Sequence, residues 1–384
     1  MFELKTTTEQ LQEFCDRAGR HDFVTLDTEF LREKTYYPRL CLLQMAYPGD
    51  GPGSLALFDT LSPQLSLQPL SGLLLDEKTV KVLHAARQDL EIFHLQLGVL
   101  PEPLFDTQIA AMVCGYGDQV GYDVLVQDIA GAKTDKAPKI TDWSVRPLSE
   151  RQLRYAAADV DYLRPIYVEL CNRLRKNSRI DWIGEEIATL INPSTYHTDP
   201  EDAWLRLKRG NGTTAYRAVL CELAKFRELM AQRQNRPRNW IVPDKALLEL
   251  AGSRPTNRRS LQNSRFLPNH FKSGKYTDEL LAAVRAGLEA APDRFPATGR
   301  RAQSEPRPEI EMLRVLLKMK AKEIGVAERL IATSEDLVQV ASGNPSARPL
   351  QGWRRVQFGE DALELCAGRA ALTMKQGTTR LVTL

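Results

Sequence analysis

The stretch DFVTLDTEF, residues 22–30, decides how the first half of the chain folds. Its apolar residues alternate with smaller and polar ones, a pattern typical of a β-strand. The strand carries Asp27 and Glu29 two residues apart, so both carboxylates leave the same face. Two acids on one face repel each other unless a cation lies between them, and Mg²⁺ and Mn²⁺ prefer carboxylate oxygens. Taken alone, an exposed polar strand face explains the pair more simply than a metal site does.

The rest of the first half continues this mixed pattern. Strands are predicted at 40–47, 55–59 and 80–84, and helices at 87–97, 106–115, 122–131 and 149–176. The strands come first and the later elements are mostly helical. This order predicts an α/β fold in which helices cover a mixed sheet.

A third acid follows the last predicted strand, in HAARQDLEIF at 84–93. The strand ends near His84 and a helix begins near Arg87, so Asp89 lies in the first helical turn. A negative charge is favoured there by the helix dipole, which gives Asp89 a purely structural explanation as well. Glu91 lies two positions further on and faces away from Asp89 on a helix.

A fourth acid lies in YAAADVDYL, residues 155–163, within the long predicted helix. Tyr155 and Asp159 are four residues apart and therefore share one helical face, whereas Asp161 points elsewhere. The alanines between them have small side chains that project little from the helix. Either a ligand or another part of the backbone can approach such a surface closely.

The second half of the chain is helical in pattern and basic in charge. Residues 1–190 hold 20 basic and 28 acidic side chains, a net charge of −8, whereas residues 191–384 hold 32 and 21, a net charge of +11. A basic half beside an acidic half indicates a module that binds polyanions next to a site rich in carboxylates. Two solvated surfaces that differ by chance remain the alternative. The densest basic group consists of Arg233, Arg236, Arg238, Arg254, Arg258 and Arg259.

The cysteines and the chain start exclude several classes of protein. The six cysteines are scattered and no two have CxxC spacing, which argues against a disulfide framework or a zinc cluster. The start, MFELKTTTEQ, lacks the features of a signal peptide, and no apolar run is long enough to cross a bilayer. We therefore expect a cytoplasmic protein with reduced thiols and no membrane partner.

The motifs LDTEF, HAARQDLEIF and YAAADVDYL, in this order, resemble the three exonuclease motifs of the DEDDy family of 3′→5′ exonucleases. The stretch at 141–163 is similar to the ribonuclease D branch of that family, and the two helical regions resemble tandem HRDC domains. The resemblance covers nearly the whole chain. It implies a ribonuclease H-like α/β exonuclease domain followed by two small all-α domains. The implied boundaries are 1–192 for the exonuclease, 193–212 for a linker, 213–292 for the first HRDC domain, 293–308 for a second linker and 309–384 for a second HRDC-like domain.

The resemblance also implies roles for individual residues. The acids that match the motifs, and that would hold two Mg²⁺ or Mn²⁺ ions, are Asp27, Glu29, Asp89 and Asp159. Tyr155 matches the tyrosine that orients the attacking water by a hydrogen bond. Asp106, in FDTQIAAM, is expected to start a helix rather than to bind metal. Trp143 and Trp240 are expected to be core residues rather than stacking platforms.

The function implied by the resemblance is a 3′→5′ exoribonuclease that releases nucleoside 5′-monophosphates. Its implied partners are tRNA precursors and other small structured RNAs, and the protein is expected to be a monomer. Two alternatives stay open. A DNA exonuclease shares the same acids, because nothing in the motifs selects the sugar. An inactive nucleic-acid-binding adaptor is the other alternative, although the presence of all four acids and Tyr155 counts against it.

Overall fold

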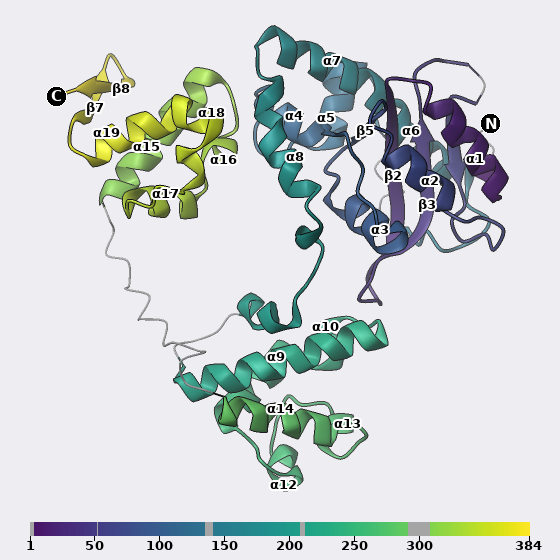
Figure 1. Cartoon of the computed structure of the whole chain (residues 1–384), viewed down its shortest axis with the longest axis vertical. Helices are drawn as coiled ribbons and strands as arrows, with labels where there is room; N and C mark the ends of the chain where they lie inside the picture. The colour runs from purple at the N-terminus through teal and green to yellow at the C-terminus, as the bar shows by residue number, and fades with distance from the viewer. Residues whose placement is uncertain (1–3, 52, 135–140, 208–211, 291–307) are drawn as a thin grey trace. The chain divides into compact units, whose positions relative to one another are not determined.

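The computed structural model describes residues 4–51, 53–134, 141–207, 212–290 and 308–384 (Figure 1). The chain forms two compact units. The first unit comprises Met1–Glu29, Cys41–Asn192 and Ser304–Leu384, and the second comprises Phe30–Leu40 and Pro193–Gln303. The predicted linker at 293–308 lies outside the described residues except for Pro308, so the predicted domain boundaries stay predictions.

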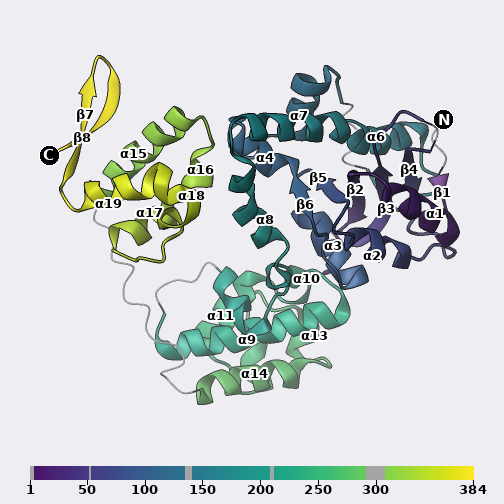
Figure 2. The same ribbon diagram turned by 45° about the horizontal axis from the view of Figure 1, so that its top comes forward.

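A six-stranded sheet forms the centre of the N-terminal part of the first unit (Figure 2). The strands are β1 (Leu4–Lys5), β2 (Phe23–Leu31), β3 (Arg39–Ala46), β4 (Leu55–Phe58), β5 (Val80–Leu83) and β6 (Leu104–Asp106). Their order is β1-β4-β3-β2-β5-β6. Strand β5 runs parallel to β2 and β6, β1 runs parallel to β4, and β3 runs antiparallel to β4. The predicted mixed sheet is therefore confirmed. Strands β1 and β6 were not predicted, because segments this short show no alternation.

Helices cover the sheet, as the order of elements predicts. They are α1 (Thr8–Ala18), α2 (Gln68–Leu74), α3 (Arg87–Leu97), α4 (Thr107–Val113), α5 (Tyr122–Leu125), the π-helix η1 (Val126–Ala130), α6 (Glu150–Asp161), α7 (Leu163–Lys176), the 3₁₀-helix η3 (Ile180–Ile183) and α8 (Gly184–Leu190). The single helix predicted at 149–176 is two helices that meet at Tyr162. Pro165 explains the break, because it has no N–H to donate to the carbonyl of Asp161.

Asp106 starts helix α4, as predicted, and it also binds the segment that leads into α3. Its buried carboxylate caps α4 by accepting hydrogen bonds from the backbone amides of Gln108 at 2.8 Å and Ile109 at 3.2 Å. It also accepts from the amides of Ala85 at 3.2 Å and Ala86 at 2.8 Å, just before α3 begins. One carboxylate therefore fixes the starts of both α3 and α4.

We predict that Asp106→Ala lowers the melting temperature by roughly 5–10 °C, because four backbone amides, one of them fully buried, lose their acceptor. Asp106→Asn should cost less, since one side-chain oxygen remains. Differential scanning calorimetry measures both variants, with Asp50→Ala at an exposed position as the matched control. A melting temperature of Asp106→Ala equal to that of the control would contradict this role.

The second unit is helical. Its elements are the 3₁₀-helices η4 (Pro193–Thr195) and η5 (Pro200–Arg206) and the helices α9 (Thr214–Gln234), α10 (Arg238–Ile241), α11 (Asp244–Ser253), α12 (Arg258–Gln262), α13 (Asn269–Lys272) and α14 (Thr277–Glu289). The long helix α9 packs against α14, where a Cβ on Gly287 would lie 2.5 Å from the Cα of Val219. Glycine at this position lets the two helices approach closely.

The loop that follows β2 belongs to this helical unit. The Oδ1 atom of Asn235 accepts hydrogen bonds from the backbone amides of Tyr36 at 3.1 Å and Tyr37 at 3.0 Å. The Tyr36 hydroxyl donates to Glu228, a side chain that is only 1% exposed. Arg238 pairs with Glu228 and lies 4.7 Å from the centroid of the Tyr36 ring. A polar network centred on the buried Glu228 thus ties the loop to α9 and α10.

The C-terminal part of the first unit is a separate helical module with a hairpin at its end. Its elements are α15 (Pro308–Ile324), α16 (Glu328–Ile331), α17 (Ser334–Ala341), the 3₁₀-helix η7 (Arg348–Leu350), α18 (Gly352–Arg354), the π-helix η8 (Arg355–Gly359), α19 (Glu360–Cys366), β7 (Ala370–Lys375) and β8 (Thr378–Thr383). Helix α19 ends at Cys366, and an antiparallel hairpin follows it. Its two-residue turn, Gln376 and Gly377, has positive φ at both positions, as tight hairpins require.

This C-terminal module packs on the N-terminal α/β part of the same unit through one buried arginine. Arg354 is fully buried, donates to the carbonyl of Leu330 at 2.6 Å and forms ion pairs with Glu185 and Glu186. The neighbouring Trp353 ring stacks on that of Trp182, with centroids 4.2 Å apart. A buried charge needs such partners, so this contact specifies how the module attaches.

Candidate active site

Strand β2 and helix α6 bring three of the four predicted acids together. One carboxylate oxygen each of Asp27, Glu29 and Asp159 lie within 4.8 Å of one another. Asp27 and Glu29 meet because a strand repeats every two residues, and Asp159 reaches them from a helix that packs on the sheet. A cluster of carboxylate oxygens at this spacing fits a hard divalent cation such as Mg²⁺ or Mn²⁺.

Helix α6 is fixed on the sheet by its start and by its buried backbone. Ser149 and Gln152 form a capping box at its N-terminus. The buried Thr25 hydroxyl donates to the carbonyl of Val160 at 2.8 Å, and Thr25 lies two residues before Asp27 on the same strand. This bond joins β2 directly to α6, next to Asp159.

Asp89 is placed by α3 and held by β2. Its carboxylate is 6% exposed and accepts a hydrogen bond from the Thr28 hydroxyl. It is not one of the three acids whose oxygens lie within 4.8 Å of one another. Its charge nevertheless acts on the cluster, since it contributes to raising the pKa of Asp27.

The electrostatics of the cluster favour a bound cation. Burial, followed by the charges of Asp159, Asp89 and Glu29, raises the pKa of Asp27 well above its ordinary value. Burial also raises the pKa of Asp89 to about 7, against the hydrogen bond from Thr28, which lowers it. Both carboxylates are therefore costly to ionise in the folded protein without a counter-charge.

We predict a pH-dependent effect of Asp89→Asn in EDTA. Ionising wild-type Asp89 destabilises the folded state, because the pKa of Asp89 is higher in the folded than in the unfolded protein. This loss of stability is absent near pH 4 and grows until the pH passes about 7. At pH 8 the variant should melt roughly 5 °C or more above wild type, and this gain should shrink at pH 5.

Differential scanning fluorimetry at both pH values tests this prediction, with Glu77→Gln at an exposed position as the control. Adding Mg²⁺ or Mn²⁺ should raise the melting temperature of wild type at pH 8 more than that of the variant. An identical difference between variant and wild type at pH 5 and pH 8 would show that Asp89 carries no such penalty.

Tyr155 lies one helical turn before Asp159 and is hydrogen-bonded to it. Burial and the charges of Asp159, Glu29 and Asp27 raise the pKa of Tyr155, so its phenol stays protonated at neutral pH. The ring lies beside Trp143, with centroids 6.1 Å apart. Trp143 is 2% exposed, which confirms the prediction that it is a core residue.

Two residues that support the site were not predicted. The Tyr122 hydroxyl donates to the carbonyls of Ala158 at 2.9 Å and Asp159 at 2.7 Å, and so it orients the C-terminal turn of α6. Arg146 forms two bonds with Asp59, of 2.7 and 2.6 Å, and also donates to the carbonyl of Trp143. The bonds from Tyr122 to α6 and from Arg146 to Asp59 join residues distant in sequence, and no local pattern indicates either contact.

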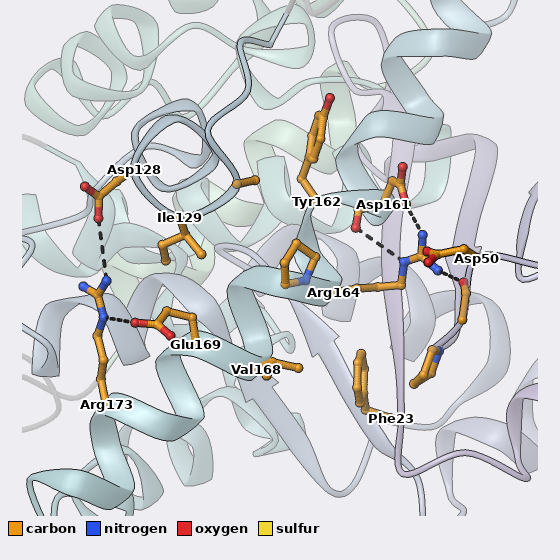
Figure 3. Close-up of a pocket in the computed structure, with 14 residues that line it drawn as sticks. Phe23, Asp50, Asp128, Ile129, Asp161, Tyr162, Arg164, Val168, Glu169 and Arg173 are labelled. Atoms are coloured by element: carbon orange, nitrogen blue, oxygen red, sulfur yellow. Dashed lines mark hydrogen bonds and ion pairs between the residues drawn. The ribbon is translucent and has the colours of Figure 1, made fainter.

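Asp161 belongs to a different part of the surface, as its place on the helix predicts. It lines a cleft of about 870 Å³ whose charged groups are largely paired with one another (Figure 3). Asp161 pairs with Arg164, which also donates to the carbonyl of Tyr47, and Glu169 pairs with Arg173. Paired charges of this kind stabilise the surface and leave little charge for a ligand.

The predicted arginine group of the helical unit divides into two sets. Arg233, Arg238 and Arg258 form ion pairs with Glu279, Glu228 and Asp278 respectively. The arginines that remain exposed, with no ion pair among the described residues, are Arg236, Arg254 and Arg259.

The prediction that Trp240 is a core residue is wrong, since it is 56% exposed. Helix α10 has only four residues and buries Ile241, at 3% exposure, in its place. An exposed tryptophan offers a face on which a nucleic-acid base can stack.

The comparisons with known proteins agree with this geometry. A family model described as 3′-5′ exonuclease matches residues 2–175, and one described as HRDC domain matches residues 217–284. The chain is 48% identical to ribonuclease D of Jannaschia sp. (strain CCS1) over 379 residues, which cover 98% of each chain. The chain belongs to the ribonuclease D family. It is also 46% identical to ribonuclease D of Acidiphilium cryptum, over 98% of this chain and 96% of that one.

A solved structure extends the likeness to the whole fold of this ribonuclease D family member. The crystal structure of Escherichia coli RNase D matches with a TM-score of 0.82 and 29% identity, covering 96% of this chain and 99% of that chain. That protein is described as an exoribonuclease involved in structured RNA processing. Among the described residues, no helix is both long and apolar enough to cross a membrane.

Proposed function

We propose that this protein is a 3′→5′ exoribonuclease that removes nucleotides one at a time from RNA and releases nucleoside 5′-monophosphates. The observation that carries the proposal is the convergence of Asp27, Glu29 and Asp159 where β2 meets α6. The family membership supports the reaction. The RNA substrates we propose are tRNA precursors and other small structured RNAs, acted on in the cytoplasm.

The acids that would hold two Mg²⁺ or Mn²⁺ ions are Asp27, Glu29, Asp89 and Asp159. Two divalent ions, when bound, supply an activated water, charge stabilisation on the phosphate and support for the leaving 3′ oxygen. Asp27 is central to the set, because the charges of the other three all act on its carboxylate. We therefore propose that Asp27 would contribute most to holding the ions.

Tyr155 acts as a hydrogen-bond donor rather than as a base. Its raised pKa keeps the phenol protonated at neutral pH, so it can orient a water or a phosphate oxygen but cannot remove a proton. Thr28 has a supporting role, because its hydroxyl holds the Asp89 carboxylate in one orientation. Thr25 and Tyr122 fix the position of α6 on β2 through hydrogen bonds to backbone carbonyls of α6.

The helical unit contributes RNA affinity in this proposal. Its exposed arginines, Arg236, Arg254 and Arg259, are free of ion pairs among the described residues and can contact phosphates. Contacts of this kind add affinity and salt dependence without reading sequence. The distinction between RNA and DNA requires a contact to the terminal 2′-OH, which only an activity measurement can test.

A gel time course tests the proposal. The substrates are 5′-labelled single-stranded RNA and DNA of matched sequence, incubated with Mg²⁺, Mn²⁺ or EDTA. We expect a metal-dependent ladder that shortens RNA from its 3′ end while DNA is largely spared. Equal or faster shortening of DNA would support a DNA exonuclease instead. Binding without cleavage in either metal would support the adaptor.

We predict that Asp27→Ala and Asp159→Ala each reduce the cleavage rate by roughly 10³-fold or more, because each removes a metal ligand. RNA binding measured in EDTA should persist. Tyr155→Phe should lower the rate by about 10²-fold, since it loses only the hydroxyl. The matched control is Asp161→Asn, a change of an acid on the same helix that pairs with Arg164. Cleavage at the wild-type rate in both alanine variants would refute the catalytic assignment.

A further inference from the structure

The C-terminal module carries a cleft that lies outside the residues matched by the HRDC model. The cleft has a volume of about 870 Å³ and is lined by α15, by α16 and by the start of α17. Gly117 and Asp118, from the loop after α4, also line it. The four acids of the active site are not among its lining residues.

One wall of the cleft is a row of basic side chains. Arg314, Lys318 and Lys322 all line it and follow each other at four-residue intervals along α15. Residues at this interval share one helical face and are about 6 Å apart along the axis. The row therefore presents positive charge at regular steps along the length of the cleft.

Most of this charge is available to a ligand. Lys318 and Lys322 are exposed and form no ion pair among the described residues. Arg314 pairs with Glu311 on its own helix at 2.6 Å. Arg329, on the opposite side, lies 3.9 Å from the Asp118 carboxylate, which is a loose and exposed pair.

Lys320 differs from its neighbours on α15, although it lies between them in sequence. It is not among the lining residues, and its ammonium pairs with Asp361 and lies 3.8 Å from Glu323. Helix α15 therefore has two kinds of lysine. Lys320 forms an ion pair within the module, whereas Lys318 and Lys322 line the cleft.

The floor of the cleft is apolar and tightly packed. Leu317, Ala321 and Leu337 line it and are each at most 5% exposed. A polyanion can place its charged groups against the basic wall while its less polar parts lie on this floor. A repeating row of charge with an apolar floor suits a polymer with regularly spaced phosphates better than a single small anion.

We propose that this cleft binds the phosphodiester backbone of RNA and gives the enzyme affinity for substrates longer than the few nucleotides at the active site. The proposal rests on the proposed function, because it assumes that RNA is the substrate. It assigns the binding to Lys318 and Lys322, with Arg314 and Arg329 in support. The contacts are to phosphates, so the cleft selects nucleic acid by charge and not by sequence.

The test compares full-length wild type with the double variant Lys318→Gln/Lys322→Gln. Affinity for a 5′-fluorescein-labelled RNA hairpin with a single-stranded 3′ end is measured by fluorescence anisotropy in EDTA, over a series of salt concentrations. We expect the dissociation constant to rise roughly tenfold and the slope of log affinity against log salt to fall by about two. The matched control is Lys320→Gln, which removes one lysine of the same helix outside the cleft and should leave both quantities unchanged.

Unchanged affinity and salt slope in the double variant would overturn the proposal, as would an equal loss in Lys320→Gln. Because binding is measured in EDTA, the result does not depend on catalysis. If wild type fails to shorten RNA in Mg²⁺ or Mn²⁺ but the double variant loses affinity, the cleft is supported and the proposed enzymatic function fails. If RNA is shortened and the affinity of the double variant is unchanged, the proposed function is supported and the cleft fails.

Discussion

Repulsion among carboxylates at the junction of β2 and α6 is the constraint on which the exonuclease part depends. Asp27, Glu29 and Asp159 bring their oxygens within 4.8 Å of one another, and Asp89 adds a further buried charge. Burial raises the pKa of Asp27 and Asp89, so the protein alone holds these groups at a cost. A divalent cation removes that cost, and this makes metal affinity a direct consequence of the packing.

Much of the surrounding structure serves to hold this arrangement. Thr25 and Tyr122 bond to backbone carbonyls in the C-terminal half of α6, where Asp159 lies. Thr28 bonds to Asp89, and Asp106 fixes the start of the helix that carries it. The bonds are buried or partly buried, and the loss of any one leaves a polar group without this partner. The positions of Asp89 and Asp159 are thus set by a second layer of hydrogen-bonding side chains.

The helical parts show how charge is divided between structure and binding. Arg354 is buried and paired with two glutamates, and Lys320 is paired with Asp361, so both stabilise the C-terminal module. Lys318 and Lys322 face a cleft and stay exposed. The basic character of the second half therefore has two physical origins. A count of charges in the sequence cannot separate them, because it does not show which side chains have partners.

The sequence by itself determined the features that depend on local periodicity. The two-residue spacing of Asp27 and Glu29 places them on one strand face, and the four-residue spacing of Tyr155 and Asp159 places them on one helical face. The capping role of Asp106 is local as well. The motif resemblance identified Asp89, but only packing puts its charge close enough to affect Asp27.

Only the tertiary structure decided the contacts between residues distant in sequence. The bonds from Thr25 and Tyr122 to α6 join segments that no periodic pattern connects. Trp240 is exposed because the one-turn helix that carries it buries Ile241, and a count of apolar residues does not reveal which neighbour turns inward. The hairpin β7–β8 had a local signal, in its alternation and its Gln376–Gly377 turn, yet its place after α19 depends on where that helix ends. Burial is a property of the whole fold, whereas spacing is a property of the chain.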